Sequence, residues 1–274
     1  GQEQADLACR RLQARAMSVA MRWLRAGAPR SMGALIWQWN DVWAGHSWSL
    51  VDVAGRRKPA WDAVRRACAP RVLSIEPTGG FEQGRPGALE VVLSDDAAFL
   101  GPASFERASA RAVVERMDFA GNVRARAAVD LVPFAACGLP AATLRGAIPS
   151  EILEGARRGH EMLVATVEGD ASVGRAVELL GSDADLVLPP ARFERVVGAA
   201  ARVRAASVIH EFWIEQSWRV APRAATSGAD ERDPEAKALE QAARMGKWRT
   251  LLPGDEIELP PDAGWWSANA FAAR

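Results

Sequence analysis

The sequence lacks an excess of charge of either sign. Lys and Arg together number 34, as do Asp and Glu. Binding to nucleic acid or to an anionic membrane depends on a net or patchy basic charge, so this balance argues against both partners. No apolar run approaches the roughly 18 residues of a spanning helix, and the polar start GQEQAD does not resemble a signal peptide. We therefore expect neither a nucleic-acid nor a membrane partner.

The sequence is also poor in cysteine. Cys9, Cys68 and Cys137 lie far apart, without the spacing of a metal site. Their odd number suits a reducing compartment better than a disulfide scaffold, so we expect a cytoplasmic protein with small, buried apolar cysteines. The possibility of an upstream secretion signal stays open, because Gly1 is not an initiator methionine.

Residues 2–26 have the periodicity of an amphipathic helix. Apolar side chains recur along one face at spacings of four and three residues, namely Leu12, Ala16, Val19 and Trp23. Gly27 and Pro29 then provide a stop signal. Such a helix needs a partner layer for its apolar face.

A short α/β arrangement is predicted next. Met32–Gln38 is a mostly apolar run without alternation, which is typical of a strand buried on both faces. Lys58–Ala67 is predicted to form a second helix, with Pro59 in its first turn and Pro70 beyond its end. One strand cannot form a sheet, so residues 1–71 look like part of a larger α/β domain.

From about Val72, short β-type runs replace the helical periodicity. The first group comprises Leu89–Ser94, Arg111–Met117, Val123–Val132, Leu163–Glu168 and Ala184–Leu188. The second comprises Val203–Ile209, Phe212–Trp218, Trp248–Leu252, Glu256–Leu259 and Trp266–Ala273. Short strands at this spacing are typical of β-sandwiches, which predicts one domain over 72–197 and another over 198–274. The polar segment 226–247 is predicted to be an insertion in the second.

The residues between Gly33 and Trp61 differ from the rest of this Ala-, Arg- and Val-rich chain. Five tryptophans lie there, together with Asn40, Asp41 and His46. A sugar ring presents C–H groups on one face and hydroxyls around its edge. A sugar site therefore needs a flat aromatic ring below and polar groups beside it, and this stretch supplies both.

The order of these residues resembles the end of the catalytic barrel of glycoside hydrolase family 2, most closely its β-mannosidase branch. The resemblance covers roughly residues 29–71 and rests on Met32, Gly33, Trp37, Gln38, Asn40, Asp41, Trp43, Ser47, Trp48, Ser49, Asp52, Gly55, Arg56 and Lys58. Ala44 and Gly45-His46 depart from the family pattern. The resemblance implies a mixed fold, in which a C-terminal fragment of a (β/α)8 barrel precedes two immunoglobulin-like β-sandwich domains.

The resemblance also implies roles for individual residues. Trp37 would be the platform beneath the sugar at the cleaved bond, followed by a non-proline cis peptide; the alternative is a place in the barrel core. Asn40 and Asp41 either hold sugar hydroxyls or brace the loop, since Asn-Asp is also ordinary turn chemistry. Trp43 and Trp48 would serve as packing residues and as the pocket wall rather than as direct ligands. Substrate contact is thus expected from Trp37, Asn40, Asp41 and Trp43, and bracing of the barrel mouth from Asp52 and Lys58.

The activity implied is that of a retaining β-mannosidase-like exo-glycosidase acting on β-mannosides or manno-oligosaccharides, with no cofactor and no metal. Retaining glycosidases need two carboxyl groups about 5 Å apart. In the resembled family both are glutamates that follow the fourth and seventh barrel strands, so we expect them before Gly1. We therefore expect no catalytic residue in this chain, no activity of the chain alone, and the rest of the barrel as its partner.

Two other classes stay open. One is a carbohydrate-binding module, and the other is a structural part of another family 2 glycosidase, of the β-galactosidase or β-glucuronidase type. Trp213, Trp218, Trp248, Trp265 and Trp266 either form a stacking surface or fill a sandwich core. Among the histidines, His46 is more plausibly a polar loop residue than a proton shuttle, and His160 and His210 are expected to be structural.

Overall fold

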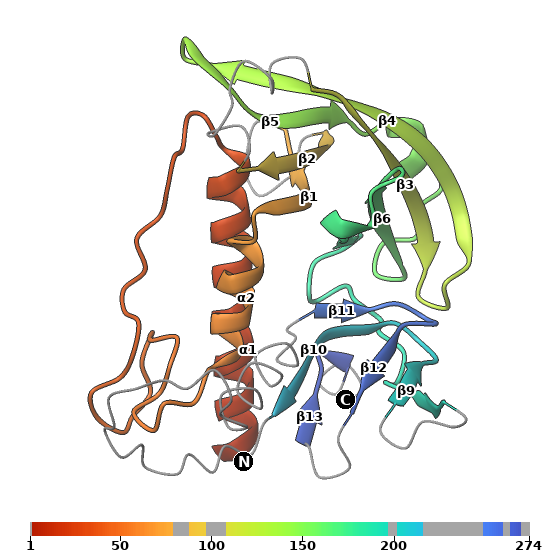
Figure 1. Cartoon of the computed structure of the whole chain (residues 1–274). Coiled ribbons are helices and arrows are strands. Elements are labelled where there is room, and N and C mark those ends of the chain that lie inside the picture. Colours follow the sequence, from red (N-terminus) through yellow and green to blue (C-terminus); the bar gives the residue numbers. More distant parts are fainter. Residues whose placement is uncertain are drawn as a thin grey trace, which may run out of the picture. The chain divides into compact units, whose positions relative to one another are not determined.

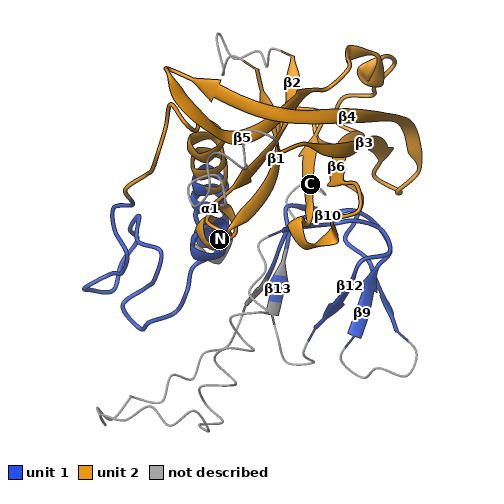
Figure 2. Cartoon of the chain, turned by 45° about the horizontal axis from the view of Figure 1, so that its top comes forward, with its two compact units in different colours: residues 1–17, 36–63, 190–274 blue, residues 18–35, 64–189 orange. Residues whose placement is uncertain are grey.

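The computed structural model describes residues 2–78, 88–96, 108–196, 202–215, 249–259 and 264–269 (Figure 1). Two compact units can be distinguished (Figure 2). Unit 1 consists of residues 1–17, 36–63 and 190–274, and unit 2 consists of residues 18–35 and 64–189. Strands predominate over helices in the described residues, as the sequence predicts.

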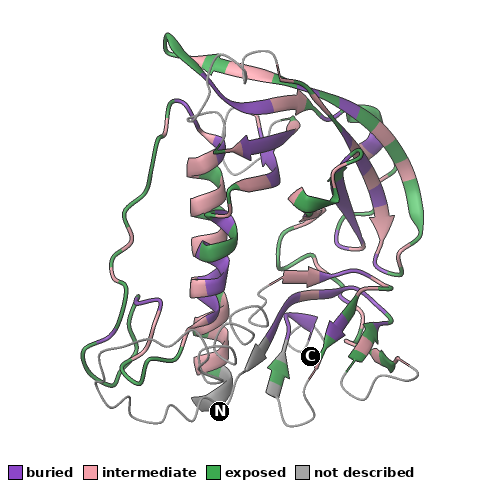
Figure 3. Ribbon diagram, in the orientation of Figure 1, coloured by how far each residue is buried: buried purple, intermediate pink, exposed green. Residues whose placement is uncertain are grey.

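Both predicted helices are present. Helix α1 spans Gln2–Ala26 and helix α2 spans Pro59–Ala67. The backbone N–H of Gly27 donates to the carbonyl oxygen of Trp23 at 2.9 Å where α1 ends. The apolar stripe of α1 is largely open to solvent, since Leu12 is 57% exposed and Trp23 45%, whereas Ala14 is buried. Figure 3 shows that most of this helix falls in the intermediate and exposed classes. In the described part of the chain, neither helix combines the length and the apolar character that crossing a membrane requires.

Unit 2 is built on one antiparallel sheet. Its strands are β1 (Arg71–Pro77), β2 (Leu89–Asp95), β3 (Ala110–Asp118), β4 (Val123–Ala136), β5 (Leu139–Ala147), β6 (Glu161–Val167) and β7 (Arg175–Leu179). They lie in the order β1-β2-β5-β4-β3-β6-β7. The pairing register of β1 and β2 places buried apolar residues opposite each other. Leu73 of β1 lies opposite Leu93 of β2, and both are buried.

The sheet of unit 2 curls around a single core. Buried side chains from both ends of the sheet share one cluster, including Ile75, Val91, Val114, Leu163 and Ala176. The long strand β4 pairs with both β3 and β5, and the end strands β1 and β7 lie against each other. The sheet is therefore nearly closed, like a barrel. Removal of these apolar groups from water on the inner face of the sheet is the main stabilising contribution.

Unit 1 contains two small sheets. Strands β8 (Phe193–Arg195), β9 (Arg202–Ala205) and β12 (Glu256–Glu258) form one, in the order β12-β9-β8. Strands β10 (Ile209–Glu215), β11 (Arg249–Leu251) and β13 (Gly264–Trp266) form the other, in the order β11-β10-β13. Ile209, Phe212, Leu251 and Ile257 make up most of the buried core between them.

Most predicted strands are present with shifted ends, but two predictions are wrong. Met32–Gln38 is not a strand, and no strand of the described residues pairs with it. Met32 is 61% exposed and Leu35 is fully exposed, so the expected burial on both faces is also absent. Ala184–Leu188 is a turn and coil, in which the N–H of Asp185 donates to the carbonyl oxygen of Ser182 at 2.9 Å. The predicted insertion 226–247 lies outside the described residues.

The expectation of buried cysteines is also wrong. Cys9, Cys68 and Cys137 are exposed free thiols. Cys68 directly follows the last residue of α2. Cys137 lies in the tight turn between β4 and β5, with a backbone φ of 55°. Positions at element ends and turn tips face solvent, whatever the apolar character of the side chain.

Candidate functional site

Residues 37–51 form a loop with bonded ends, called here the ring-bearing loop. The N–H of Leu50 donates to the carbonyl oxygens of Gln38 at 3.2 Å and Trp39 at 3.1 Å. The N–H of Val51 donates to Trp39 at 3.0 Å, and that of Asp41 donates to Val51 at 2.9 Å. These bonds fix the base of the loop, so the conformation of its middle depends on what fills its interior.

The ring-bearing loop exposes its tryptophans. Trp37 and Trp43 are each 74% exposed, Trp48 is 63% exposed and Trp39 is 59% exposed. Indole rings usually pack into a core, because each removes a large apolar area from water when it is buried. Several exposed indoles on one loop are typical of a binding surface.

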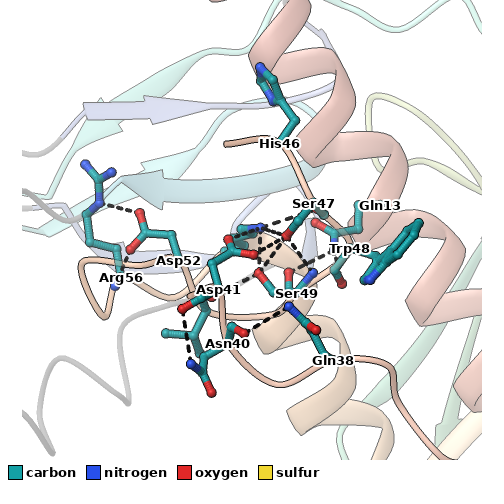
Figure 4. Close-up of polar contacts among 12 residues, drawn as sticks. Gln13, Gln38, Asn40, Asp41, His46, Ser47, Trp48, Ser49, Asp52 and Arg56 are labelled. Atoms are coloured by element: carbon teal, nitrogen blue, oxygen red, sulfur yellow. Dashed lines mark hydrogen bonds and ion pairs between the residues drawn. The ribbon is translucent and has the colours of Figure 1, made fainter. Parts of the chain in front are cut away.

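The interior of the same loop is polar (Figure 4). Asp41 is only 7% exposed and Ser49 is fully buried. The hydroxyl of Ser47 donates to Asp41 Oδ1, and the ammonium of Lys58 lies 3.1 Å from Asp41 Oδ2. Lys58 Nζ also donates to Ser49 Oγ at 2.8 Å, and that hydroxyl donates to the carbonyl oxygen of Val51 at 2.9 Å. Buried polar groups are tolerable when they are paired in this way.

These contacts keep Asp41 ionised. The hydrogen bond from Ser47 lowers the pKa of the Asp41 carboxyl most, burial opposes this shift, and Ser49 and Lys58 lower the pKa further. The net direction is downward from the ordinary value of 3.8. At neutral pH the interior of the loop therefore holds a carboxylate and an ammonium ion in contact.

Helix α1 provides a second anchor for the loop. Gln13 Nε2 donates to the carbonyl oxygen of Trp48 at 2.8 Å and to that of Ser49 at 3.0 Å. Gln13 has no local sequence signal, since nothing marks a residue that lies 35 positions before its partner. Its amide satisfies carbonyl groups that the loop itself leaves open.

The structure separates the four candidate substrate-binding residues. Trp37, Asn40 and Trp43 are exposed, whereas Asp41 lies inside the loop. Asn40 Nδ2 donates to the carbonyl oxygen of Asp41 at 3.2 Å. The peptide bond between Trp37 and Gln38 is cis, as the sequence resemblance implies.

Two further residues of this stretch lie outside the polar interior. Asp52 closes a tight turn: its Oδ1 accepts from the N–H of Ala54 at 2.9 Å, and its Oδ2 accepts from Arg56 Nε at 2.6 Å. His46 is exposed, with Nδ1 3.5 Å from Asp6 Oδ1 on α1. Within the described ranges, no three His, Cys, Asp or Glu side chains gather into a group suited to a metal ion.

Unit 1 also contains a buried charge cluster that the sequence did not predict. Glu211 on β10 is 5% exposed, has a φ of 51°, and accepts a hydrogen bond from Arg11 Nε of α1. The side chain of the neighbouring His210 is 12% exposed, and burial, with smaller effects of Arg15 and Arg11, lowers its pKa to about 3. His210 is therefore neutral at physiological pH.

Comparisons with known proteins point to one group. A 43-residue stretch is 46% identical to β-mannosidase B of Emericella nidulans, and a 53-residue stretch is 43% identical to β-mannosidase B of Thermothelomyces thermophilus. The predicted resemblance to β-mannosidases is confirmed. The matched stretches cover 16% and 19% of this chain, and only 5% and 6% of those two enzymes. No family model matches the chain.

A solved crystal structure has a similar fold. The crystal structure of a β-D-mannosidase from Dictyoglomus thermophilum superimposes with a TM-score of 0.57 and 17% sequence identity. The superposition covers 93% of this chain and 28% of that protein. At this level of identity the likeness concerns the fold. The chain thus spans well under a third of the length of the β-mannosidase that it resembles in structure.

Proposed function

We propose that this chain is the C-terminal portion of a retaining β-mannosidase-like exo-glycosidase that removes terminal β-D-mannosyl residues. The observation that carries the proposal is the ring-bearing loop, with exposed indoles outside and paired polar groups inside. An indole gives a flat apolar face for the C–H side of a sugar, and an amide beside it bonds to hydroxyls. The similarity to β-mannosidases makes a mannoside the substrate class of choice.

Within this proposal each exposed residue has a role. Trp37 is the platform beneath the reacting sugar, Asn40 holds a sugar hydroxyl at the rim, and Trp43 forms the pocket wall. The amide of Asn40 has a second N–H and a carbonyl oxygen besides the donor used toward Asp41, so it has capacity for a hydroxyl.

The catalytic carboxyl groups come from elsewhere in the enzyme. Retention requires one carboxyl group that protonates the leaving oxygen and a second, about 5 Å away, that forms the glycosyl-enzyme. We assign both to glutamates of the catalytic barrel outside this chain. Residues 1–71 then complete the barrel, and residues 72–197 and 198–274 form two immunoglobulin-like domains.

The proposal is tested by the substrate preference of the enzyme that contains this chain. Aryl β-mannoside, β-galactoside and β-glucuronide are compared by kcat/KM, using release of the same phenol. We expect the β-mannoside to be preferred by at least about tenfold, which corresponds to roughly 1.4 kcal/mol of differential transition-state binding. Preference for the galactoside or the glucuronide would contradict the mannosidase proposal and favour another family 2 activity.

The terminal tryptophans give little support to a separate binding module. Trp213 is buried, and Trp265 packs edge-on against Phe193 with ring centroids 5.2 Å apart. The buried ring of Trp213 has no free face for a sugar, and Trp265, although 39% exposed, is a single ring packed edge-on. Trp218 and Trp248 lie outside the described residues.

A further inference from the structure

Lys58 connects three points of the ring-bearing loop, although it lies outside that loop, directly before α2. Its ammonium lies 3.1 Å from Asp41 Oδ2, 2.8 Å from Ser49 Oγ and 3.3 Å from Ser47 Oγ. The carbonyl oxygen of Ser47 is a fourth acceptor at 3.4 Å, so the three N–H donors of the ammonium group are fully used by Asp41, Ser47 and Ser49. One cation thus ties together residues 41, 47 and 49 of the loop.

The tied points lie on either side of the exposed rings. Asp41 and Ser47 bracket the segment that carries Trp43, and Ser47 and Ser49 bracket Trp48. Because the hydroxyl of Ser47 also donates to Asp41 Oδ1, both ends of the Trp43 segment meet at one carboxylate. A segment with joined ends has fewer accessible conformations than an open one. The indole of Trp43 is therefore presented in a restricted position.

The contacts of Asp41 leave it unsuited to hold a sugar hydroxyl directly. Both carboxylate oxygens already have partners, and the residue is only 7% exposed. A sugar hydroxyl would have to enter this enclosed site beside Ser47 and Lys58, and displacing either of them would leave a buried charge with a poorer partner. Of the two roles that the sequence left open for Asp41, bracing fits the geometry.

We propose that Asp41 and Lys58 act as a pair of positioning residues that hold the ring-bearing loop so that Trp43 and Trp48 face the substrate. The inference rests on the proposed function, since it assigns the pair to a sugar site. The pair is expected to act as a unit, because removing either charge leaves the other buried without compensation.

The test uses isosteric or nearly isosteric changes in the enzyme that contains this chain. The variants are Asp41→Asn, Lys58→Met and the double change. The matched control is Asp52→Asn, because Asp52 and Arg56 form a similar acid–base pair at 2.6 Å in the same stretch, outside the polar interior. Each variant is assayed with an aryl β-mannoside and with its monodeoxy analogues.

We expect Asp41→Asn and Lys58→Met each to lower kcat/KM at least about tenfold, and the double variant to fall within about threefold of the worse single variant. The factor should be the same for the mannoside and for every deoxy analogue, because a positioning residue bonds to no single hydroxyl. Asp52→Asn should stay within about twofold of the parent enzyme. A loss that disappears with one deoxy analogue would make Asp41 a direct ligand and overturn the inference.

A second measurement follows the ring itself, without catalysis. The chain is labelled with 5-fluorotryptophan, and the ¹⁹F line of Trp43 is assigned by its loss in Trp43→Phe. We expect this line to shift or sharpen in Asp41→Asn and Lys58→Met, and to stay in place in Asp52→Asn. An unchanged line in Asp41→Asn would refute the positioning role even if Lys58→Met failed to fold. If the enzyme has no β-mannosidase activity but the line moves, the proposed function fails while the pairing stands.

Discussion

Trp37 is the residue on which the proposed sugar site most depends. Its side chain is 74% exposed at the base of the ring-bearing loop, so it contributes little to the stability of this chain. In the enzyme that contains this chain, we expect Trp37→Ala to lower kcat/KM for an aryl β-mannoside at least about tenfold, or about 1.4 kcal/mol, with an unchanged melting temperature.

The control for Trp37 is another exposed indole of the same loop. Trp39 is 59% exposed and has no assigned contact with the sugar, so Trp39→Ala should keep most of the activity. Equal kinetics of the Trp37→Ala variant and the parent enzyme would show that Trp37 is not the platform. Equal losses in both variants would indicate a general effect on the loop.

Glu76 of β1 gives unit 2 a pH dependence of a defined sign. The side chain is buried, and this burial raises the pKa of its carboxyl above the ordinary 4.5, with Arg22, 3.9 Å away, opposing the shift. A folded-state pKa above the unfolded value means that the folded protein binds more protons between the two values. The free energy of unfolding therefore falls as pH rises from about 4.5 through the raised pKa, then levels off.

The matching experiment is denaturant unfolding of the chain at several pH values between 4 and 8, with a Glu76→Gln variant beside it. We expect this part of the pH dependence to disappear in the variant, because the amide does not titrate. A variant curve that stays parallel to the parent curve over the whole range would contradict the buried, proton-binding state of Glu76.

The individual residues of the site could be predicted only in part. Local composition singles out Trp37, Asn40, Asp41 and Trp43, because dense rings and polar groups in a short stretch have few other uses. From the sequence alone, Asp41 could either bind a sugar hydroxyl or brace the loop, since the choice depends on where its carboxylate points. Gln13 could not have been identified at all, because its contact with the loop arises from tertiary packing.

Among the secondary-structure elements, the helices were the easiest to predict. A 3.6-residue period with Gly27 and Pro29 at the end defines α1, and Pro59 defines the start of α2. Met32–Gln38 was predicted as a strand from its apolar run alone, but a strand also needs a hydrogen-bonded neighbour, and the described residues provide none.

Several strands of unit 2 have no clear strand pattern in the sequence. Strand β1 is buried along most of its length, so it lacks the alternation of a half-exposed strand. Strand β5 contains Pro140, Gly146 and three alanines, residue types that are depleted in strands. Both strands form because their neighbours in the curled sheet bury them. Tertiary context therefore outweighs local preference here.

Gly146 on β5 tests how tightly the curled sheet is packed. A Cβ at this position would lie 2.4 Å from the carbonyl oxygen of Asp130 and 2.5 Å from Val129 Cγ1 on β4. We expect Gly146→Ala to lower the free energy of unfolding by about 1–3 kcal/mol, as overpacking does elsewhere. Thermal unfolding followed by circular dichroism measures the change.

The control for Gly146 is Gly33, where an added Cβ meets no atom within 4 Å. Gly33→Ala should leave the melting temperature nearly unchanged. If Gly146→Ala were equally harmless, strands β4 and β5 would have to lie farther apart than they do in this structure.

At the scale of the whole molecule, the chain combines a curled β-sheet with a helix and a loop that expose apolar side chains. Leu12 and Trp23 on α1, Leu35, and Trp43 on the ring-bearing loop are all substantially exposed. The β-rich character was predictable from the short runs and turn signals. The assignment of segments to the two units was not, because each unit draws on residues distant in the sequence.

The proposal that the catalytic carboxyl groups lie outside this chain is tested most directly by an activity assay of the purified chain with an aryl β-mannoside. We expect no release of the phenol above the buffer rate, because Asp41 is paired on both oxygens and the proposal assigns the two catalytic glutamates to the rest of the barrel. The enzyme that contains this chain, assayed in parallel, should hydrolyse the same substrate. Turnover by the purified chain that persists through purification and disappears in Asp41→Asn would contradict the proposal, since this chain would then carry its own catalytic carboxylate.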